Sequence, residues 1–361
     1  MNILPTNGPL ISAIVIAYDR PEMIRHALRA LLDQTYRDLE IIVVLNGATE
    51  EVRHVVGEFQ ARASNVEVVS FPVNVYDWDD VTLVTRMVYR AGFEASSGEY
   101  VFLQSDDDFV ATDFFARMAS LFMENSACTT AIGLPESHYW ADGSTVPPDP
   151  GAWMERARYM EGREAALHCI ADPDEFMPNP GFSYVMRRGE ILRVDGLWTN
   201  GINLPQVTQV VPFGVTGFDA KAAMYWGRGV HQGNVVVNSL SGKRHLRLKL
   251  GYLQLDQRIR ASAELMWSEA FGSDSTKELT RVLRSFEDEQ TAELLAKSLS
   301  AGRVPTFLHV LKVGRPSLSS LGSFRWWRVF AVVFLWHLPS SVKAFVRAFV
   351  SSSVVKRVMK I

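Results

Sequence analysis

The sequence has little cysteine, with only Cys128 and Cys169 among 361 residues. Two thiols cannot build a disulfide framework or a cysteine-based zinc site, which excludes those classes and fits a reducing compartment. Long apolar runs are also missing, because Ile11–Tyr18 and Val329–Trp336 fall well short of the roughly 20 residues of a membrane-spanning helix. Residues 1–9 contain no basic segment leading into an apolar one, so we expect no secretory signal.

Acidic side chains are absent from the last part of the chain. Glu293 is the last of 40 acidic residues, and the 68 residues after it hold 11 of the 37 basic ones. The formal net charge of −3 therefore divides into −14 for residues 1–293 and +11 for residues 294–361. A basic tail on an acidic body is typical of a segment that binds a membrane surface or a nucleic acid.

The composition of the body is that of a folded protein. Hydrophobic residues make up 47% and charged residues 21% of the chain, which excludes wholesale disorder. The length allows a full hydrophobic core, and it predicts two domains or one large domain with an appendage.

Short apolar strands alternate with amphipathic helices in the first hundred residues. We predict strands over 12–18, 40–45, 66–71 and 100–103, with helices beginning at Pro21 and covering 50–63 and 81–95. This alternation predicts βαβ units and a parallel sheet. Ligands of such sheets lie at the carboxyl ends of the strands, which here are residues 17–19, 45–47 and 104–108.

Three adjacent aspartates, Asp106, Asp107 and Asp108, follow directly after the fourth predicted strand. Adjacent carboxylates repel one another unless a cation lies among them, and Mg²⁺ and Mn²⁺ prefer such oxygen ligands. Because residues i and i+2 of an extended segment point the same way, we expect Asp106 and Asp108 to share one metal ion. A solvated loop with a helix cap is the alternative, but the position at a strand's carboxyl end favours the metal site.

Several short motifs follow one another between residues 10 and 110. They are Ile14–Pro21, Leu31–Tyr36, Leu39–Val44, Gly92, Ala95 and Gly98–Leu103 running into Ser105–Asp107. In the order and spacing of these motifs, residues 10–110 resemble the nucleotide-binding half of family 2 glycosyltransferases. The resemblance implies the GT-A fold, an α/β fold with a Rossmann-like, mixed and mostly parallel sheet flanked by helices. It also implies inverting transfer of a sugar from a nucleotide-diphosphate donor, helped by Mn²⁺ or Mg²⁺.

The resemblance also implies roles for single residues in this half. Asp106 falls on the metal-binding aspartate of the D-x-D motif and Gln104 on its first aspartate, with Asp108 as a substitute second carboxylate. Asn46 and Gln104 place an amide where the family carries an acid, which keeps hydrogen bonding but removes a negative charge. The nucleotide-binding residues implied in this way are Ala17, Tyr18, Asp19, Asn46, Arg90, Gln104 and Asp106.

The resemblance is looser beyond residue 110. Asp219 takes the place of the catalytic base, which must reach the acceptor hydroxyl opposite the leaving nucleotide, with Asp174 and Glu175 as weaker candidates. The alternative role of Asp219 is the cap of a helix predicted over 220–226. His245, after a strand predicted over 234–240, completes a metal set with Asp106 and Asp108, although a packed or surface imidazole is the alternative.

Acceptor-binding residues are expected in the irregular segments. Gly181 lies in a Pro-Gly loop that resembles the one before the family's acceptor-site strand. Trp140 and Trp198 are acceptor candidates because indole rings stack on the apolar faces of sugars, while packing in the core is the alternative for each.

The basic tail has the pattern of a helix that lies in a membrane interface. After Pro339 its apolar residues recur at helical spacing, with lysines and arginines off that face. We favour a membrane over packing on the protein itself, and we expect no nucleic acid because the body is acidic. The residues expected to contact the membrane are Trp326, Trp327, Phe345 and Phe349.

The resemblance implies a GT-A domain over 1–250, with a nucleotide-binding half at 10–110 and an acceptor half at 111–250. A helical extension over 251–312 and a membrane-associating tail over 313–361 follow. The expected activity is hexosyl transfer to a lipid-linked or polysaccharide acceptor in cell-surface glycan synthesis, at the cytoplasmic face of the cell membrane. A catalytically degenerate, membrane-bound binding or scaffold subunit and a nucleotidyltransferase are the alternatives, and a homo-oligomer is left open.

Overall fold

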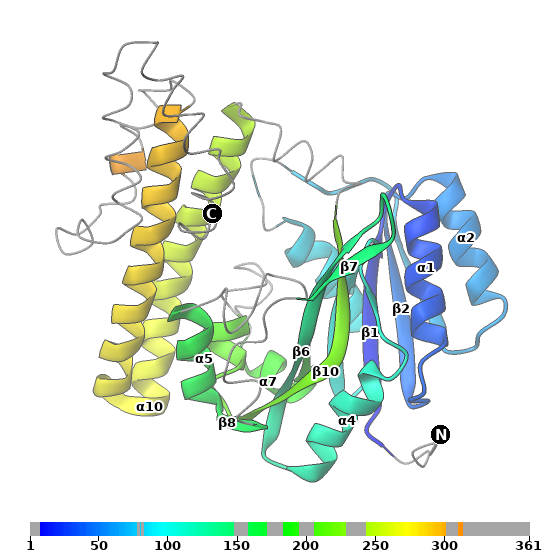
Figure 1. The fold of residues 1–361 in the computed structure, drawn as a ribbon, viewed down its shortest axis with the longest axis horizontal. Helices are drawn as coiled ribbons and strands as arrows, with labels where there is room; N and C mark the ends of the chain where they lie inside the picture. Colours follow the sequence, from blue (N-terminus) through cyan, green and yellow to red (C-terminus); the bar gives the residue numbers. More distant parts are fainter. Residues whose placement is uncertain are drawn as a thin grey trace. The chain divides into compact units, whose positions relative to one another are not determined.

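The computed structural model describes residues 8–77, 80, 83–147, 158–171, 183–194, 206–228, 243–300 and 310–312. The chain divides into two compact units, Met1–Leu240 with Leu255–Leu283, and Ser241–Gln254 with Arg284–Ile361. The first unit contains the sheet and the helices that flank it (Figure 1).

The sheet contains ten strands in the described part of the chain. Its order is β3-β2-β1-β4-β9-β6-β10-β5, with β7 paired to β6 and β8 paired to β10. The strands are β1 (Ile11–Ala17), β2 (Leu39–Asn46), β3 (Val66–Phe71), β4 (Tyr100–Ser105), β5 (Phe109–Val110), β6 (Cys128–Tyr139), β7 (Ser144–Val146), β8 (Tyr159–Glu161), β9 (Tyr184–Arg187) and β10 (Val215–Arg228).

Helices follow most of the strands. They are α1 (Pro21–Leu32), α2 (Glu50–Gln60), the π-helical turn η1 (Thr85–Tyr89), α3 (Arg90–Ala95), α4 (Phe114–Glu124), α5 (Gly162–Ala171), α7 (Arg188–Arg193), the π-helical turn η3 (Gln206–Val210) and α10 (Lys243–Ser300). The predicted α/β fold with a mixed sheet flanked by helices is confirmed in this unit. The sheet is less parallel than expected, because four of its described strand pairings are parallel and five are antiparallel.

The strand directions bring several strand ends to one edge of the sheet. Strands β3, β2, β1 and β4 are parallel to one another. Strand β9 is antiparallel to both β4 and β6, and β10 is parallel to β6. The carboxyl end of β10 therefore lies at the same edge as the carboxyl ends of β1, β2 and β4.

The core forms on both faces of the sheet because successive strand residues alternate between the faces. On one face Ala13 and Val15 of β1 join a cluster with buried residues of α1, α2 and α4. On the other face Ile14 of β1 contacts α3, where a Cβ at Gly92 would lie 2.4 Å from Ile14 Cγ2. Gly92 therefore lets α3 approach the sheet closely.

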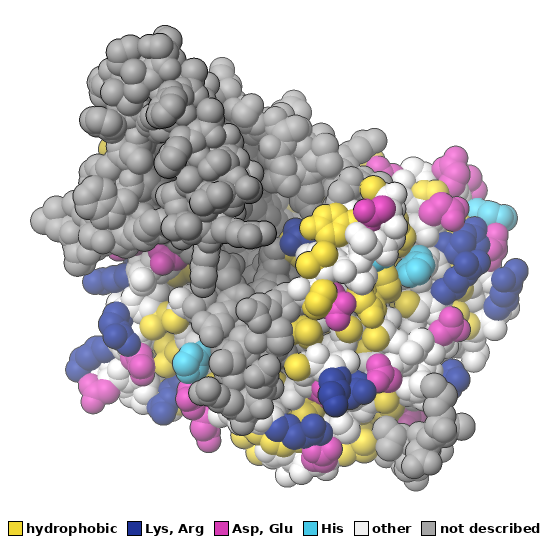
Figure 2. Space-filling view, viewed as in Figure 1, with side chains coloured by type: hydrophobic (Ala, Val, Ile, Leu, Met, Phe, Trp, Pro, Cys, Tyr) yellow, Lys and Arg dark blue, Asp and Glu magenta, His cyan; other side chains and the backbone are white. Residues whose placement is uncertain are grey.

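Local sequence explains where the two helices after β1 and β2 begin. Pro21 occupies the first turn of α1, where its missing N–H costs nothing. Thr49 caps α2 by accepting a hydrogen bond from Val52 N. On the face in Figure 2, acidic and basic side chains are interspersed over these two helices, in keeping with the ion pair between Arg25 and Glu58.

Helix α10 contains a break at Gly272, whose backbone has φ 81° and ψ 175°. Its segment Leu255–Leu283 belongs to the first unit, where Trp267 is buried and donates its Nε1 hydrogen to Thr208 O at 2.8 Å. The helix begins earlier than the predicted residue 251, and the predicted domain borders at 250 and 312 stay predictions. No described helix has both the length and the apolar character needed to cross a membrane.

One element differs in kind from its sequence pattern. The helix predicted over 220–226 is wrong, because Val215–Arg228 is a single strand paired with β6, β5 and β8. Alanine and lysine favour helix locally, but pairing on both sides of the strand overrides that preference. The register of β10 against β6 shifts between Asp219 and Ala223, which leaves room for a bulge there.

Glu40 ties β2 to the turn that precedes β4. Its carboxylate accepts hydrogen bonds from Ser12 Oγ, from Ser97 N and Oγ, and from Gly98 N. Burial by itself would raise the pKa of Glu40, but these hydrogen bonds outweigh it and hold the pKa below its usual value of 4.5. A carboxyl with a lowered pKa stabilises the fold above its unfolded pKa and loses that contribution as pH falls.

We expect Glu40→Gln to lower the free energy of unfolding at pH 7 by about 2 kcal/mol, because charge-assisted hydrogen bonds are lost. The difference from wild type should shrink as pH falls below about 4.5, where the unfolded carboxyl is protonated. Urea denaturation at several pH values measures this difference in the free energy of unfolding. Glu67→Gln, on the exposed face of β3, is the matched control. A pH-independent loss in Glu40→Gln would contradict this role.

Candidate active site

The acidic cluster, defined as Asp106, Asp107 and Asp108, lies at the shared carboxyl edge of the strands. The loop after β1 reaches it through Tyr18 N, which donates to Asp106 Oδ2 at 3.3 Å. The end of β10 reaches it through Gly227 N, which donates to Asp108 Oδ1 at 2.9 Å. Two separate segments thus close on the loop after β4.

Arg20 supplies a positive charge to this cluster. Its Nη1 atom lies 3.1 Å from Asp106 Oδ1 and 3.1 Å from Asp107 Oδ1. Its Nε atom lies 3.7 Å from Asp19 Oδ1. One guanidinium group therefore bridges two neighbouring carboxylates and contacts a third on its own loop.

All three side chains of the acidic cluster are buried, with exposed fractions of 4%, 7% and 3%. Burial raises the pKa of Asp106 to about 7, although Arg20 opposes the shift. Burial and the neighbouring charge of Asp107 hold the pKa of Asp108 well above its usual value of 3.8. Buried carboxylates of this kind are costly without a cation nearby, which makes the cluster a candidate functional site.

The extended geometry expected for residues 106–108 is wrong, and the sharing of one metal ion by Asp106 and Asp108 stays a prediction. Asp106 and Asp107 are the two carboxylates that converge on one cation, and an oxygen of Asp108 is taken by Gly227 N. The reason is local: Asp108 N donates to Ser105 O at 3.3 Å, so the segment turns instead of staying extended. No group of three His, Cys, Asp or Glu side chains converges to hold a metal within the described residues.

The donor set of Asp106 and Asp107 nevertheless fits a divalent cation. Two carboxylate oxygens already flank a single positive centre at equal distance, and hard cations take oxygen ligands at shorter range. Such an ion would need the space that Arg20 Nη1 fills.

The two amides singled out in the sequence, Gln104 and Asn46, are each engaged within the chain. Gln104 is fully buried and donates its Nε2 hydrogen to Asp108 O at 2.8 Å. Asn46 donates its Nδ2 hydrogen to Asn74 Oδ1 at 3.0 Å and accepts one from Val75 N at 3.0 Å. Both side chains therefore support loops at the carboxyl edge, and their predicted contacts with a nucleotide stay predictions.

Gly227 allows β10 to approach the acidic cluster. A Cβ at this position would lie 2.3 Å from Asp107 O and 2.6 Å from Trp140 Nε1. Trp140 in turn donates its Nε1 hydrogen to Asp107 O at 3.0 Å. The acceptor candidate Trp140 thus lies beside the cluster and holds its backbone.

Aromatic rings pack around Trp140. His138 lies 5.0 Å from it between ring centroids, His26 of α1 lies 5.4 Å away, and Phe109 lies 6.0 Å away. Burial lowers the pKa of both His26 and His138. Neutral imidazoles in this position add no positive charge to the neighbouring cluster.

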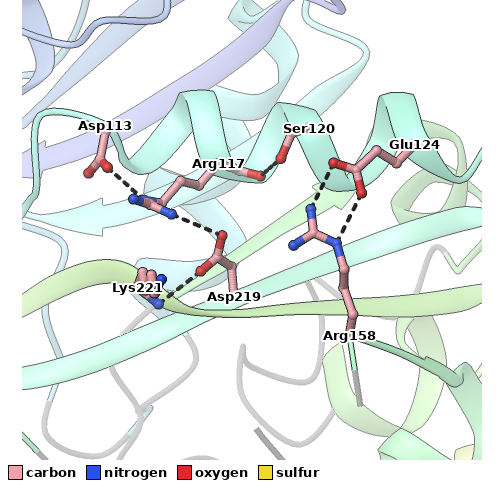
Figure 3. A network of polar contacts seen from close by, with 7 residues as sticks. All are labelled: Asp113, Arg117, Ser120, Glu124, Arg158, Asp219 and Lys221. Atoms are coloured by element: carbon pink, nitrogen blue, oxygen red, sulfur yellow. Dashed lines mark hydrogen bonds and ion pairs between the residues drawn. The ribbon is translucent and has the colours of Figure 1, made fainter. Parts of the chain in front are cut away.

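Asp219 lies elsewhere on the sheet. Figure 3 shows it facing Arg117 of α4, with Asp219 Oδ2 at 3.5 Å from Arg117 Nη1 and Oδ1 accepting a hydrogen bond from Lys221 N at 2.8 Å. Its partner on β6 is Gly133, whereas the partner of Gly227 is His138. Five strand residues separate these positions, which corresponds to about 17 Å.

Other predicted residues are not brought to the acidic cluster by the described structure. Arg90 is exposed on α3 and forms an ion pair with Glu94 at 2.8 Å. His245 belongs to α10 in the second unit, and its side chain is not among those described. The residues that lie outside the described part are Asp174, Glu175, Gly181, Trp198, Trp326, Trp327, Phe345 and Phe349.

Sequence reasoning missed Arg20 and Gly227. Arg20 was visible as a basic residue directly after the first strand, in the loop expected to meet a ligand. Nothing in the local sequence singles out Gly227, because its role depends on contacts with residues more than a hundred positions away.

The part of the chain that holds the acidic cluster matches a known protein family. Residues 12–164 match the profile described as Glycosyl transferase family 2. The predicted resemblance to family 2 glycosyltransferases is therefore confirmed, on the part of the chain that holds the acidic cluster.

Curated relatives are similar over the same part. An uncharacterized glycosyltransferase of Haemophilus influenzae is 27% identical over 127 residues, 35% of this chain and 36% of that protein. An uncharacterized glycosyltransferase of Nostoc is 32% identical over 98 residues, 27% of this chain and 28% of that protein. The chain thus matches less than half the length of either relative.

Solved structures share the fold at low sequence identity. Residues 1–349 of TarS from S. aureus, in complex with UDP-GlcNAc, align at a TM-score of 0.50 and 13% identity, covering 85% of this chain and 91% of that one. The mannosyltransferase PcManGT from Pyrobaculum calidifontis, in complex with GDP-Man and Mn²⁺, aligns at 0.52 and 13%, covering 98% and 88%. These similarities confirm the GT-A-like fold.

Proposed function

We propose that this protein is an inverting glycosyltransferase that moves a hexose from a nucleotide-diphosphate donor to an acceptor hydroxyl. The observation that carries the proposal is the buried acidic cluster, which lies at the carboxyl edge of the sheet within the part that matches family 2. This edge is where open α/β sheets bind their ligands.

Groups suited to a nucleotide line the same edge. Tyr18 follows β1 and is 38% exposed, and Tyr76 follows β3 and is 46% exposed. Exposed aromatic rings offer flat surfaces on which a nucleotide base can stack. Asn74 supports the loop after β3 by accepting a hydrogen bond from Tyr76 N at 2.8 Å. The nucleotide sugars present in the TarS and PcManGT complexes support a donor of this class.

Mn²⁺ or Mg²⁺ is part of the proposal. Asp106 and Asp107 are the residues that would hold it, in place of the Asp106, Asp108 and His245 set predicted from the sequence. Such an ion would offset negative charge on the diphosphate leaving group. The Mn²⁺ in the PcManGT complex supports this use.

Glu136 is a better placed base than Asp219. Glu136 is the register partner of Tyr225, which is itself the partner of Phe109, the residue after Asp108. Along β6, Glu136 lies two residues, about 7 Å, from His138, the partner of Gly227. Gly133, the partner of Asp219, lies five residues, about 17 Å, from the same His138. Burial raises the pKa of Glu136 above its usual value of 4.5, which suits a proton acceptor better than a carboxylate paired with Arg117.

The acceptor and the location are proposed from the sequence. The basic tail, with Trp326, Trp327, Phe345 and Phe349, is proposed to hold the protein on the cytoplasmic face of the cell membrane. There it would meet a lipid-linked or polysaccharide acceptor in cell-surface glycan synthesis.

If the donor binds at the acidic cluster, a nucleoside diphosphate should bind in the presence of Mn²⁺ or Mg²⁺. Asp106→Asn should weaken that binding by about 10- to 100-fold, because one carboxylate ligand is lost. Isothermal titration with a panel of nucleoside diphosphates measures it, with the exposed Asp274→Asn as control.

No binding to any nucleotide of the panel would reject the proposed donor class. Tight binding without transfer or hydrolysis of any nucleotide sugar would favour the non-catalytic binding subunit instead. Full binding in Asp106→Asn would move the site away from the acidic cluster.

The base assignment is tested by comparing two carboxylates on the sheet. Glu136→Gln should lower kcat by about 10²- to 10⁴-fold with donor affinity kept, because only proton removal is lost. Asp219→Asn should stay within about threefold of wild type, since its partner is Arg117. The reverse result would restore Asp219 as the base.

Deletion of residues 322–361 should release the protein from anionic liposomes in a flotation assay, because each basic residue near such a surface contributes about 1 kcal/mol. Neutral liposomes are the control, and wild type should float less well with them. Unchanged flotation of the shortened protein would place membrane contact outside the tail.

A further inference from the structure

Arg20 occupies the centre of the acidic cluster. Its Nη1 atom has no exposed surface and lies at 3.1 Å from one oxygen of Asp106 and from one of Asp107. The rest of the side chain is about one third exposed, so the guanidinium enters the cluster from the solvent side. This route allows Arg20 to leave without disturbing the sheet.

Arg20 lowers the electrostatic repulsion within the acidic cluster when no metal ion is bound. Three neighbouring carboxylates buried without a counter-charge would destabilise the fold strongly. Arg20 brings one positive charge to the two carboxylates it bridges, while Gly227 N and Tyr18 N donate hydrogen bonds to Asp108 and Asp106. The protein can therefore fold around the cluster before any metal ion is present.

Asp106 and Asp107 are also the residues that would hold a divalent cation. A guanidinium and a divalent cation cannot share the space between them, because the two cations repel each other at this range. Binding of one must therefore expel the other.

We propose that Arg20 is a resident counter-ion that competes with a divalent cation for Asp106 and Asp107. The inference rests on the metal use in the proposed function, and it adds that metal binding is coupled to release of Arg20. The cost of that release weakens metal binding, because the apparent dissociation constant equals the intrinsic one divided by the fraction of molecules whose site is free. If Arg20 occupies the site in nine molecules of ten, its removal should tighten metal binding about tenfold.

The first test measures Mn²⁺ binding alone, without nucleotide, by electron paramagnetic resonance of the free ion. Arg20→Gln should bind Mn²⁺ about tenfold more tightly than wild type. Arg25→Gln, on the helix that follows Arg20, is the matched control, because Arg25 pairs with Glu58 at 2.8 Å and should leave Mn²⁺ affinity unchanged. Adding Asp106→Asn to Arg20→Gln should abolish the gain, which places the ion in the cluster.

Equal or weaker Mn²⁺ binding in Arg20→Gln would overturn the proposal, and so would the absence of Mn²⁺ binding in both proteins. The test is independent of the donor. If the protein binds no nucleotide but Arg20→Gln binds Mn²⁺ more tightly, the proposed function is rejected. The competition between Arg20 and the metal ion is then still supported.

A second test uses the wild-type chain, in case Arg20→Gln does not fold. Phenylglyoxal modifies accessible guanidinium groups, and peptide mass spectrometry reports the modified arginines. Saturating Mn²⁺ should increase labelling of Arg20 severalfold while labelling of Arg25 stays constant. Unchanged or reduced labelling of Arg20 would overturn the proposal.

Discussion

The burial of three consecutive carboxylates at one edge of the sheet is the constraint on which the rest of the site depends. Asp106, Asp107 and Asp108 are stable there only because separate segments bring positive charge and N–H donors to them. The loop after β1 contributes Tyr18 N and Arg20, and the end of β10 contributes Gly227 N. The topology that places these ends together is therefore a condition for the cluster.

The neutral side chain of Gln104 fits this balance of charge. A carboxylate at this fully buried position would add a fourth negative charge beside Asp108, against one guanidinium. The amide instead donates to the backbone carbonyl of Asp108 and fixes the turn. The neutral amide at position 104 and the positive charge of Arg20 both limit the negative charge that the acidic cluster carries without a metal ion.

The sequence predicted those parts of the structure that depend on neighbouring residues. Buried strands such as Ile11–Ala17 and Leu39–Asn46 show as apolar β-branched runs, and Pro21 marks the start of the following helix. The carboxyl-edge position of Asp106 followed from that alternation. Two expectations failed for different reasons. A local turn, closed by the hydrogen bond from Asp108 N to Ser105 O, replaces the assumed extended geometry of 106–108. Pairing with β6 makes Asp219 part of a strand, which the local sequence does not show.

At the candidate site, the residue types follow from local sequence and their partners from contacts between distant parts of the chain. The residue types at the acidic cluster could be read from the sequence, because aspartates after a strand are a local signal. Their partners could not, because Arg20 lies 86 positions before Asp106 and Gly227 lies 119 positions after Asp108. Glu136 stands out only when the register of β6, β10 and β5 is known.

The hydrogen bond from Gly227 to Asp108 also has a consequence for the order of events during synthesis. The donor follows its acceptor by 119 residues, so the ribosome makes the acidic loop long before the strand that closes it. At about 5–20 residues per second, the nascent chain waits on the order of 10 s with that edge of the sheet incomplete. Tyr18 and Arg20 are already synthesised by then, so the aspartates have these two partners before the strand that carries Gly227 is made.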